Sequence, residues 1–151
     1  MRVLLVDESD RLLLFCSGTE SGGSLRWYTV GGGVEQGESL QAAALREVRE
    51  ETGLTELTLS SEVWTGRPWQ AVRDGVVYEI CQHYYMARVL PFTIDTSAFE
   101  DFERAMVTGH RWWTLDELRA TSDILRPAGL PDLFGRLLVE GPPAHPLSVD
   151  G

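Results

Sequence analysis

Three consecutive glycines, Gly31 to Gly33, separate two stretches of opposite character, and this junction constrains the fold more than any other feature. Before them, residues 27–30 are rich in aromatic and β-branched side chains, which favour strands. After them, residues 39–52 consist mainly of Leu, Ala, Arg and Glu, which are strong helix formers. Ser39 is a good N-cap and Gly53 a good helix terminator. The sequence therefore predicts a strand, a glycine loop and a helix in direct succession.

The rest of the chain predicts further strands and two more helices. Strand-like runs at residues 3–6 and 12–15 flank a turn-type tetrapeptide, which is typical of a hairpin. The other expected elements are strand-like stretches at residues 54–65 and 75–90, paired antiparallel, a helix at 115–120 after the capping-box sequence 114–117, and a helix at 130–138. Strands mixed with helices in 151 residues, about the size of one domain, indicate an α/β layered fold with a mixed sheet.

The charge balance excludes several functions. Thirteen arginines and no lysine face 23 acidic residues, so the net charge is −10. A general affinity for nucleic-acid polymers or anionic membranes is therefore not expected. A chain without lysine cannot form a lysine Schiff base or the Gly-Lys ending of a phosphate-binding P-loop.

Cysteine usage and hydropathy predict the compartment. Cys16 and Cys81 are isolated within apolar runs, so we expect both to be buried as small hydrophobic residues in a reducing compartment. The N-terminal apolar run is too short for a secretory signal, and no run is long enough to span a bilayer. A cytoplasmic location is expected.

Three carboxylates of the predicted central helix, Glu47, Glu50 and Glu51, are spaced at i, i+3 and i+4, which places them within roughly one 100° arc of the helix surface. Arg46 and Arg49 lie mostly outside this arc. Because like charges at these spacings repel, a solvated acidic face is one interpretation. The glycine loop favours another, because backbone carbonyls there can approach a ligand closely. A carbonyl with convergent carboxylates forms an all-oxygen site that suits Mg²⁺ or Mn²⁺.

The segment from Gly32 to Leu54 resembles the Nudix box, G-x5-E-x7-R-E-hydrophobic-x-E-E-x-G-hydrophobic. All nine defined positions are satisfied, at Gly32, Glu38, Arg46, Glu47, Val48, Glu50, Glu51, Gly53 and Leu54. The N-terminal hairpin and residues 111–118 also look like elements of that family, so the resemblance extends from Arg2 to about Leu138. It implies a Nudix-type α/β/α sandwich with a mixed β-sheet. We expect one domain over residues 1–140, followed by a Pro-rich tail over 141–151 that is extended or frayed.

The resemblance also implies an activity, the metal-dependent hydrolysis of a phosphoanhydride bond in a nucleoside diphosphate linked to another group. Glu50 and Glu51 would be the main Mg²⁺ ligands, and the Gly32 carbonyl another. Glu47 would be a further ligand or the base that takes a proton from water. Arg46 would orient the glutamates, so Glu47, Glu50 and Arg46 are the candidates for catalysis.

Other acidic candidates lie beside the box and beyond it. Glu38 is expected to support the metal ligands, and Glu35 is a weaker candidate for the same role. Many members of the family use a further glutamate from a loop outside the box, which corresponds here to Glu103 or Glu100. The alternative for that segment is a short amphipathic helix whose acids face solvent.

Three residues are candidates for binding the substrate. Arg67 follows a predicted strand and could hold a phosphate by charge-assisted hydrogen bonds, and Arg26 is a weaker case of the same kind. Trp27 could stack on a base, as could Tyr28 and Trp64, although aromatic residues in strands more often belong to the core.

The sequence leaves the substrate open among nucleoside triphosphates, ADP-ribose or nucleotide sugars, and dinucleoside polyphosphates. A non-catalytic Nudix-like module that binds a nucleotide as a sensor or regulator is the alternative function. Such modules often lack a box carboxylate, and none is lacking here. A small-molecule nucleotide is the expected partner, and a homodimer is compatible with the aromatic-rich strands.

Overall fold

The computed structural model describes residues 1–18, 25–73, 75–99 and 106–150. Its centre is the predicted hairpin, formed by β1 (Arg2–Val6) and β2 (Leu12–Ser17), which pair antiparallel. Alternate residues of β1 enter two different cores: Leu4 lies in one and Leu5 in the other. Because both faces of these strands are covered, their sequences are continuous apolar runs and not alternating ones.

Within the described residues, the main sheet has eight strands in the order β10-β4-β7-β1-β2-β3-β9, with β8 also paired to β2. The strands outside the hairpin are β3 (Arg26–Tyr28), β4 (Trp64–Gly66), β7 (His83–Arg88), β8 (Gly109–Trp113), β9 (Ile124–Leu125) and β10 (Leu147–Val149). The pairs β1–β7, β3–β9 and β4–β10 are parallel, whereas β2 pairs antiparallel with β1, β3 and β8. The mixed sheet expected from the sequence is confirmed.

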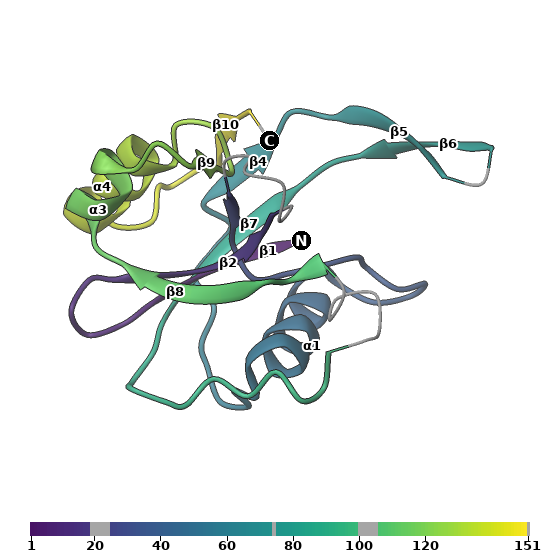
Figure 1. Cartoon of the computed structure of the whole chain (residues 1–151). Coiled ribbons are helices and arrows are strands. Elements are labelled where there is room, and N and C mark those ends of the chain that lie inside the picture. Colours follow the sequence, from purple (N-terminus) through teal and green to yellow (C-terminus); the bar gives the residue numbers. More distant parts are fainter. Residues whose placement is uncertain (19–24, 74, 100–105, 151) are drawn as a thin grey trace.

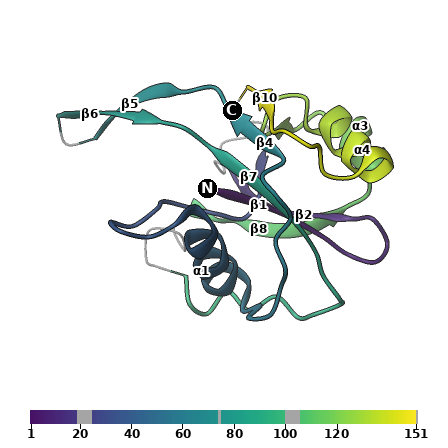
Figure 2. The ribbon, with the colours of Figure 1, turned by 180° about the vertical axis from the view of Figure 1, so that it is seen from behind.

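Helices cover both faces of this sheet (Figure 1). On one face lies α1 (Leu40–Thr52), whose buried Ala43, Ala44 and Val48 share a core with the odd-numbered residues of β1. On the other face lie α3 (Leu115–Ala120) and α4 (Leu130–Glu140). Figure 2 shows the same separation from behind. The α/β/α arrangement predicted for the fold is confirmed.

The predicted helix ends are those observed. The Ser39 hydroxyl accepts a hydrogen bond from Ala42 N at 3.1 Å, and Gly53 ends α1 in the left-handed conformation with φ 75°. Thr114 and Glu117 form the reciprocal capping box at the start of α3. These signals are local in sequence, so the sequence alone identifies them.

Three expectations about the fold are wrong. In the stretch 54–65 only the end is a strand, β4, whereas Leu57 and Leu59 pack against the α1 core. The antiparallel pairing expected between this stretch and 75–90 is confirmed, because β4 pairs antiparallel with β7. The stretch 75–90 is two strands, and the first, β6 (Val76–Ile80), pairs with β5 (Trp69–Arg73) in a separate two-stranded sheet. Cys81, between β6 and β7, is exposed, whereas Cys16 is buried as predicted.

The C-terminal tail is extended, as expected, but its end is not frayed. Leu147–Val149 form β10, which pairs in parallel with β4 at the edge of the main sheet. Val149 is buried in the core beneath α4, and this apolar contact holds the strand in place.

Within the part of the chain that the structure describes, no helix combines the length and the apolar character needed to cross a membrane.

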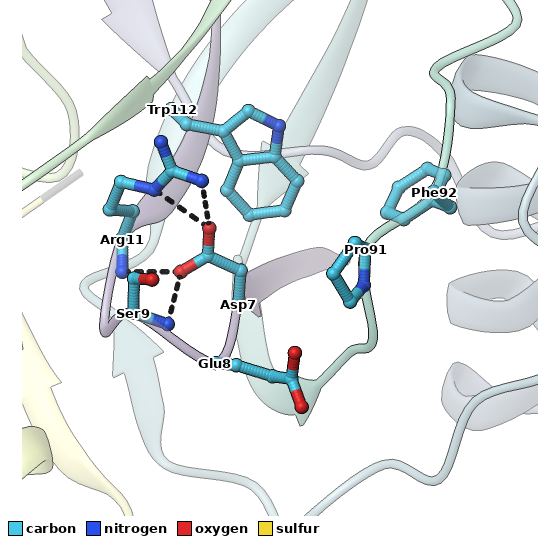
Figure 3. Close-up of a pocket in the computed structure, with 7 residues that line it drawn as sticks. All are labelled: Asp7, Glu8, Ser9, Arg11, Pro91, Phe92 and Trp112. Atoms are coloured by element: carbon cyan, nitrogen blue, oxygen red, sulfur yellow. Dashed lines mark hydrogen bonds and ion pairs between the residues drawn. The ribbon is translucent and has the colours of Figure 1, made fainter.

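A hollow of about 130 Å³ lies beside the β1–β2 turn (Figure 3). Its lining residues are Asp7, Glu8, Ser9, Arg11, Pro91, Phe92 and Trp112. The buried Asp7 carboxylate accepts hydrogen bonds from the backbone N–H groups of Ser9 and Arg11, each at 2.9 Å, and from Arg11 Nε at 2.8 Å. Burial alone would raise the pKa of Asp7, but the hydrogen bonds from Arg11 and Ser9 outweigh it, so the pKa is lowered. The carboxylate thus closes the turn and fills its own acceptor sites.

We expect Asp7→Asn to lower the free energy of unfolding at neutral pH by about 1–3 kcal/mol, because a charge-assisted network is lost. Since the folded-state pKa lies below the ordinary value of 3.8, this contribution is present above pH 4 and is lost as the pH falls through the folded pKa. Urea unfolding at neutral pH and near pH 3 measures the difference. The exposed neighbour Glu8→Gln is the control, and an Asp7 effect that does not shrink in acid would contradict the assignment.

Candidate active site

The glycine loop lies directly against α1. Gly31 has φ 135°, and a Cβ there would meet the backbone of Arg2, so the position requires glycine. The Gly31 N–H donates a hydrogen bond to Glu51 Oε2 at 2.8 Å. A Cβ on Gly32 would lie 2.6 Å from Glu47 Oε2, which shows how closely that carboxylate approaches the loop. The structure therefore brings together Gly32, Glu47 and Glu51, as the sequence predicts.

Two of the three helix carboxylates are removed from solvent. Glu47 and Glu51 are each 6% exposed, whereas the Glu50 side chain is 38% exposed. Burial of a carboxylate is costly unless hydrogen bonds or opposite charges compensate. The solvated acidic face considered above therefore does not describe Glu47 and Glu51.

Arg46 supplies much of the compensation. Its NH1 group donates to Glu47 Oε1 at 2.9 Å and to Glu50 Oε2 at 3.0 Å. Its Nε and NH2 groups donate to the two oxygens of Glu38 at 3.1 Å each, and NH2 also donates to the Gly33 carbonyl at 3.0 Å. Arg46 lies mostly off the acidic arc in its helix position, but its long side chain turns back onto the carboxylates.

The hydrogen bonds between Arg46 and Glu38 shift the pKa values of the two side chains in opposite directions. Hydrogen bonding to Glu38, and then to Glu47, raises the pKa of the Arg46 guanidinium despite partial burial. The side-chain hydrogen bond from Arg46 lowers the pKa of Glu38. Glu35 is more exposed: its backbone N–H donates to Glu38 Oε2 at 3.1 Å, and its carboxylate is 4.0 Å from Arg46 Nε. Glu38 thus holds Arg46 at the loop, and Glu35 lies at the rim.

A second cation contacts the loop. The Met1 ammonium donates to the Gly32 carbonyl at 2.8 Å. Burial, and then the charge of Arg2, lower the pKa of this ammonium, while the charge of Glu47 acts to raise it. The carbonyl predicted to bind a metal therefore already accepts a hydrogen bond from a positive group.

The donor chemistry at this place fits a hard divalent ion. Glu47, Glu50, Glu51 and the Gly32 carbonyl offer oxygen only, which Mg²⁺ and Mn²⁺ prefer. Among the described residues, however, no three Asp, Glu, His or Cys side chains converge closely enough to hold a metal ion. Protein cations contact these oxygens instead, since Arg46 bridges Glu47 and Glu50 and the Met1 ammonium donates to the Gly32 carbonyl.

Arg2 and Tyr28 also lie at the loop, and sequence reasoning missed the first. Arg2 donates to the carbonyls of Thr29 at 3.3 Å and Gly31 at 2.8 Å, and its guanidinium lies 5.8 Å from the centre of the Tyr28 ring. Burial, and then the nearby charge of Glu51, raise the pKa of Tyr28. No sequence signal marks Arg2, because the two segments are far apart in the sequence and meet through contacts such as the bridge between Val3 and Val30.

The predicted substrate-binding residues are not brought to this loop. Trp27 is buried on the opposite face of the sheet, where its ring centre lies 4.9 Å from that of Trp113 and its Nε1–H donates to Asp123 at 2.9 Å. Arg26 is exposed at the start of β3. Arg67 is 71% exposed and forms an ion pair with Asp150 at 3.2 Å. Their roles in binding stay predictions.

Glu103 and Glu100 lie outside the described residues, so the choice between them also stays a prediction.

Comparisons with known proteins agree with this geometry. A family model described as NUDIX domain matches residues 1–132. The nucleoside triphosphatase NudI of Enterobacter sp. (strain 638) is 32% identical over 109 residues, covering 70% of this chain and 77% of that protein. The E. coli dihydroneopterin triphosphate pyrophosphohydrolase has a TM-score of 0.61 and 18% identity, covering 91% of this chain and 94% of that one. The NUDIX domain of Shewanella oneidensis NrtR, complexed with ADP ribose, has a TM-score of 0.62 and 16% identity, covering 91% of this chain and 85% of that one.

A glycine loop on an acid-rich helix, within an α/β/α sandwich, is the arrangement that the Nudix box predicts. The chain belongs to the Nudix family. The enzyme class predicted from the box, a Nudix pyrophosphohydrolase, is confirmed.

The contact between Gly32 and Glu47 can be tested with two adjacent alanines. We expect Gly32→Ala to displace the Glu47 carboxylate and to lower hydrolytic activity at least tenfold, because the new Cβ would overlap it. Gly33→Ala is the matched control, since a Cβ there meets no atom within 4 Å. Nucleotide turnover and thermal unfolding measure both variants. Equal losses of activity in the two would contradict the proposed contact.

Proposed function

We propose that the chain is a Mg²⁺-dependent hydrolase that cleaves a phosphoanhydride bond in a nucleoside diphosphate linked to another group. The observation that carries this proposal is the burial of Glu47 and Glu51 against the glycine loop. Buried carboxylates beside a backbone carbonyl are costly in a purely structural helix and useful where a cation binds.

The residues that would hold Mg²⁺ are Glu47, Glu50, Glu51 and the Gly32 carbonyl, and Glu103 would be a further ligand. Mn²⁺ could bind in place of Mg²⁺. When bound, a divalent ion neutralises phosphate charge and lowers the pKa of a bound water. Other residues of the chain orient these carboxylates. Arg46 fixes the orientation of Glu47 and Glu50 through NH1, and Glu38 fixes Arg46.

Glu47 is the preferred base for the attacking water. Its carboxylate is buried beside Gly32, and one of its oxygens accepts a hydrogen bond from Arg46 at 2.9 Å. A carboxylate held at a fixed place and shielded from bulk solvent can accept a proton with little reorganisation. Glu47 would otherwise serve as a metal ligand, and Arg46 would be a positioning residue in either case.

The substrate class that best fits is a nucleoside triphosphate. The relative with the higher identity is named a nucleoside triphosphatase, and a structural neighbour acts on dihydroneopterin triphosphate. ADP-ribose, nucleotide sugars and dinucleoside polyphosphates are the other classes. Arg67, Arg26 and Trp27 stay candidates for substrate contact, and Arg2 joins them because its guanidinium donates to the Gly31 carbonyl of the glycine loop.

A nucleotide sensor is the second candidate, because the NrtR domain is found in complex with ADP ribose. It would bind a nucleotide without turnover. The complete set of box carboxylates favours hydrolysis. The cytoplasmic location and the absence of nucleic-acid or membrane partners are further proposals, which rest on the charge of −10.

We expect wild-type protein to hydrolyse one nucleotide class in the presence of Mg²⁺ and none after chelation. Glu51→Gln should reduce kcat by at least a hundredfold, because it removes the negative charge of the side chain that accepts a hydrogen bond from Gly31 N–H. Released orthophosphate, pyrophosphate and nucleoside monophosphate identify the bond cleaved. Glu140→Gln, on the exposed end of α4, is the control. Undiminished turnover by Glu51→Gln would refute the proposal, and nucleotide binding without turnover by the wild type would favour the sensor.

The role of Arg46 as the charge partner of the carboxylates can be tested by measuring stability, without an activity assay. We expect Arg46→Gln to lower the stability of the metal-free protein by about 1–3 kcal/mol, because buried Glu47 loses a charged hydrogen-bond donor. Mg²⁺ should raise the Tm of the variant more than that of the wild type, since an added cation then replaces the missing charge. Arg49→Gln, on the exposed side of the same helix, is the control. An equal response to Mg²⁺ in all three proteins would contradict this role.

A further inference from the structure

Exposed apolar side chains gather on the β5–β6 hairpin. Of the eleven large hydrophobic side chains that are exposed among the described residues, five lie between positions 69 and 78. They are Trp69 (48% exposed), Val72 (68%), Val76 (51%), Val77 (60%) and Tyr78 (48%). Single exposed hydrophobic residues need no explanation, but a contiguous group marks an interaction surface.

The strand register divides these side chains between two faces. Trp69 pairs with Ile80, Ala71 with Tyr78, and Arg73 with Val76, so both aromatic residues and Val76 lie on one face. This aromatic face is defined by Trp69, Val76 and Tyr78. Val72 and Val77 pair with each other on the opposite face, beside Gln70 and Glu79.

The hairpin receives little support from the rest of the molecule. It forms a separate two-stranded sheet, and none of its described residues belongs to either hydrophobic core. In both ribbon views it projects away from the main sheet (Figures 1 and 2). A two-stranded hairpin is marginally stable in water by itself, and unpaired edges favour association with another strand or sheet.

The charge of the hairpin distinguishes a second copy from other occupants. The two strands carry one acidic residue, Glu79, and the register places it on the face opposite the aromatic residues. Two copies that meet through the aromatic face therefore bring no acidic residues of these strands together, although the whole chain has a net charge of −10. A strongly basic partner would be attracted to the acidic surfaces of the molecule and not to this one.

The available area fits a weak dimer. With two half-exposed aromatic side chains of about 200 Å² each, together with Val76, the aromatic face offers roughly 300 Å² per copy. Two such faces, with the strand backbone and the flanking Ala71 and Ile80, bury on the order of 1,000 Å², near the lower limit for a specific interface. The expected dimer is reversible and depends on concentration.

We propose that the aromatic face of the β5–β6 hairpin is a self-association surface, on which the same face of a second copy packs in two-fold symmetry. Such an isologous contact covers the exposed aromatic rings of both copies at once. It also supports each hairpin with a second sheet layer. The proposal does not depend on the catalytic function.

Adjacent valines on opposite faces provide the test. Sedimentation equilibrium across a wide concentration range should show wild-type protein changing from monomer to dimer. Val76→Glu should weaken the association at least tenfold, because it buries a charge in the aromatic face. Val77→Glu, with the same change of side chain on the opposite face, should leave it nearly unchanged. Thermal unfolding of both variants checks that the main fold is intact.

A mixing experiment tests the symmetry. Tyr78 occupies the middle pair of the register and should lie near its counterpart in a two-fold contact. Tyr78→Glu and Tyr78→Arg should each be monomeric alone and should associate when mixed. Wild-type protein that is monomeric at every concentration would overturn the proposal, as would equal losses in the two valine variants. An unchanged mass with an altered KM in Val76→Glu would overturn it too, since the hairpin would then act on its own site.

Discussion

The hydrogen bond from Gly31 N–H to Glu51, with the close approach of Gly32 to Glu47, is the interaction on which the candidate site depends. Both carboxylates are buried, and burial of an unpaired carboxylate costs several kcal/mol. The loop can approach them because two successive positions carry no side chain. The glycines therefore serve two purposes at once: they satisfy Glu51 through the backbone, and they leave room for Glu47. Side chains at these positions would separate the loop from the helix.

The central hairpin determines where that loop lies. β1 has both faces buried. Its second residue, Val3, also forms a bridge to Val30, the residue just before the glycines. The same strand places Arg2 on the carbonyls of Thr29 and Gly31. Because successive residues point to opposite faces, a register shift of one position would move Val3 and Leu5 out of the core they share with α1. The geometry of the loop thus follows from core packing as much as from its own sequence.

The features predicted correctly are those encoded locally. The caps Ser39 and Gly53 and the box spacing depend on residues within a few turns of one another, so periodicity identifies them. The errors concern which strands pair with one another and which face a side chain enters. The pairing of the tail with β4, the separate β5–β6 sheet and the burial of Trp27 away from α1 depend on topology, which strand propensity does not specify. The contacts of Arg46 with the carboxylates do not follow from its helix position, because a helical arc describes Cβ directions and ignores the length of the side chain.

The contacts of Arg46 give a structural reason why this position carries arginine and not lysine. One planar guanidinium donates to Glu38, Glu47, Glu50 and the Gly33 carbonyl through fixed, divergent N–H groups. A lysine ammonium is a compact charge on a flexible stem and could not hold four acceptors in one plane. Arg46 is therefore committed to the carboxylates, and so it has little capacity left for an anionic ligand. For the polyphosphate substrate proposed above, charge neutralisation must then come from divalent metal and from arginines outside the helix. Arg2 is such an arginine, since it lies at the glycine loop, where its NH1 group donates to the carbonyls of Thr29 and Gly31.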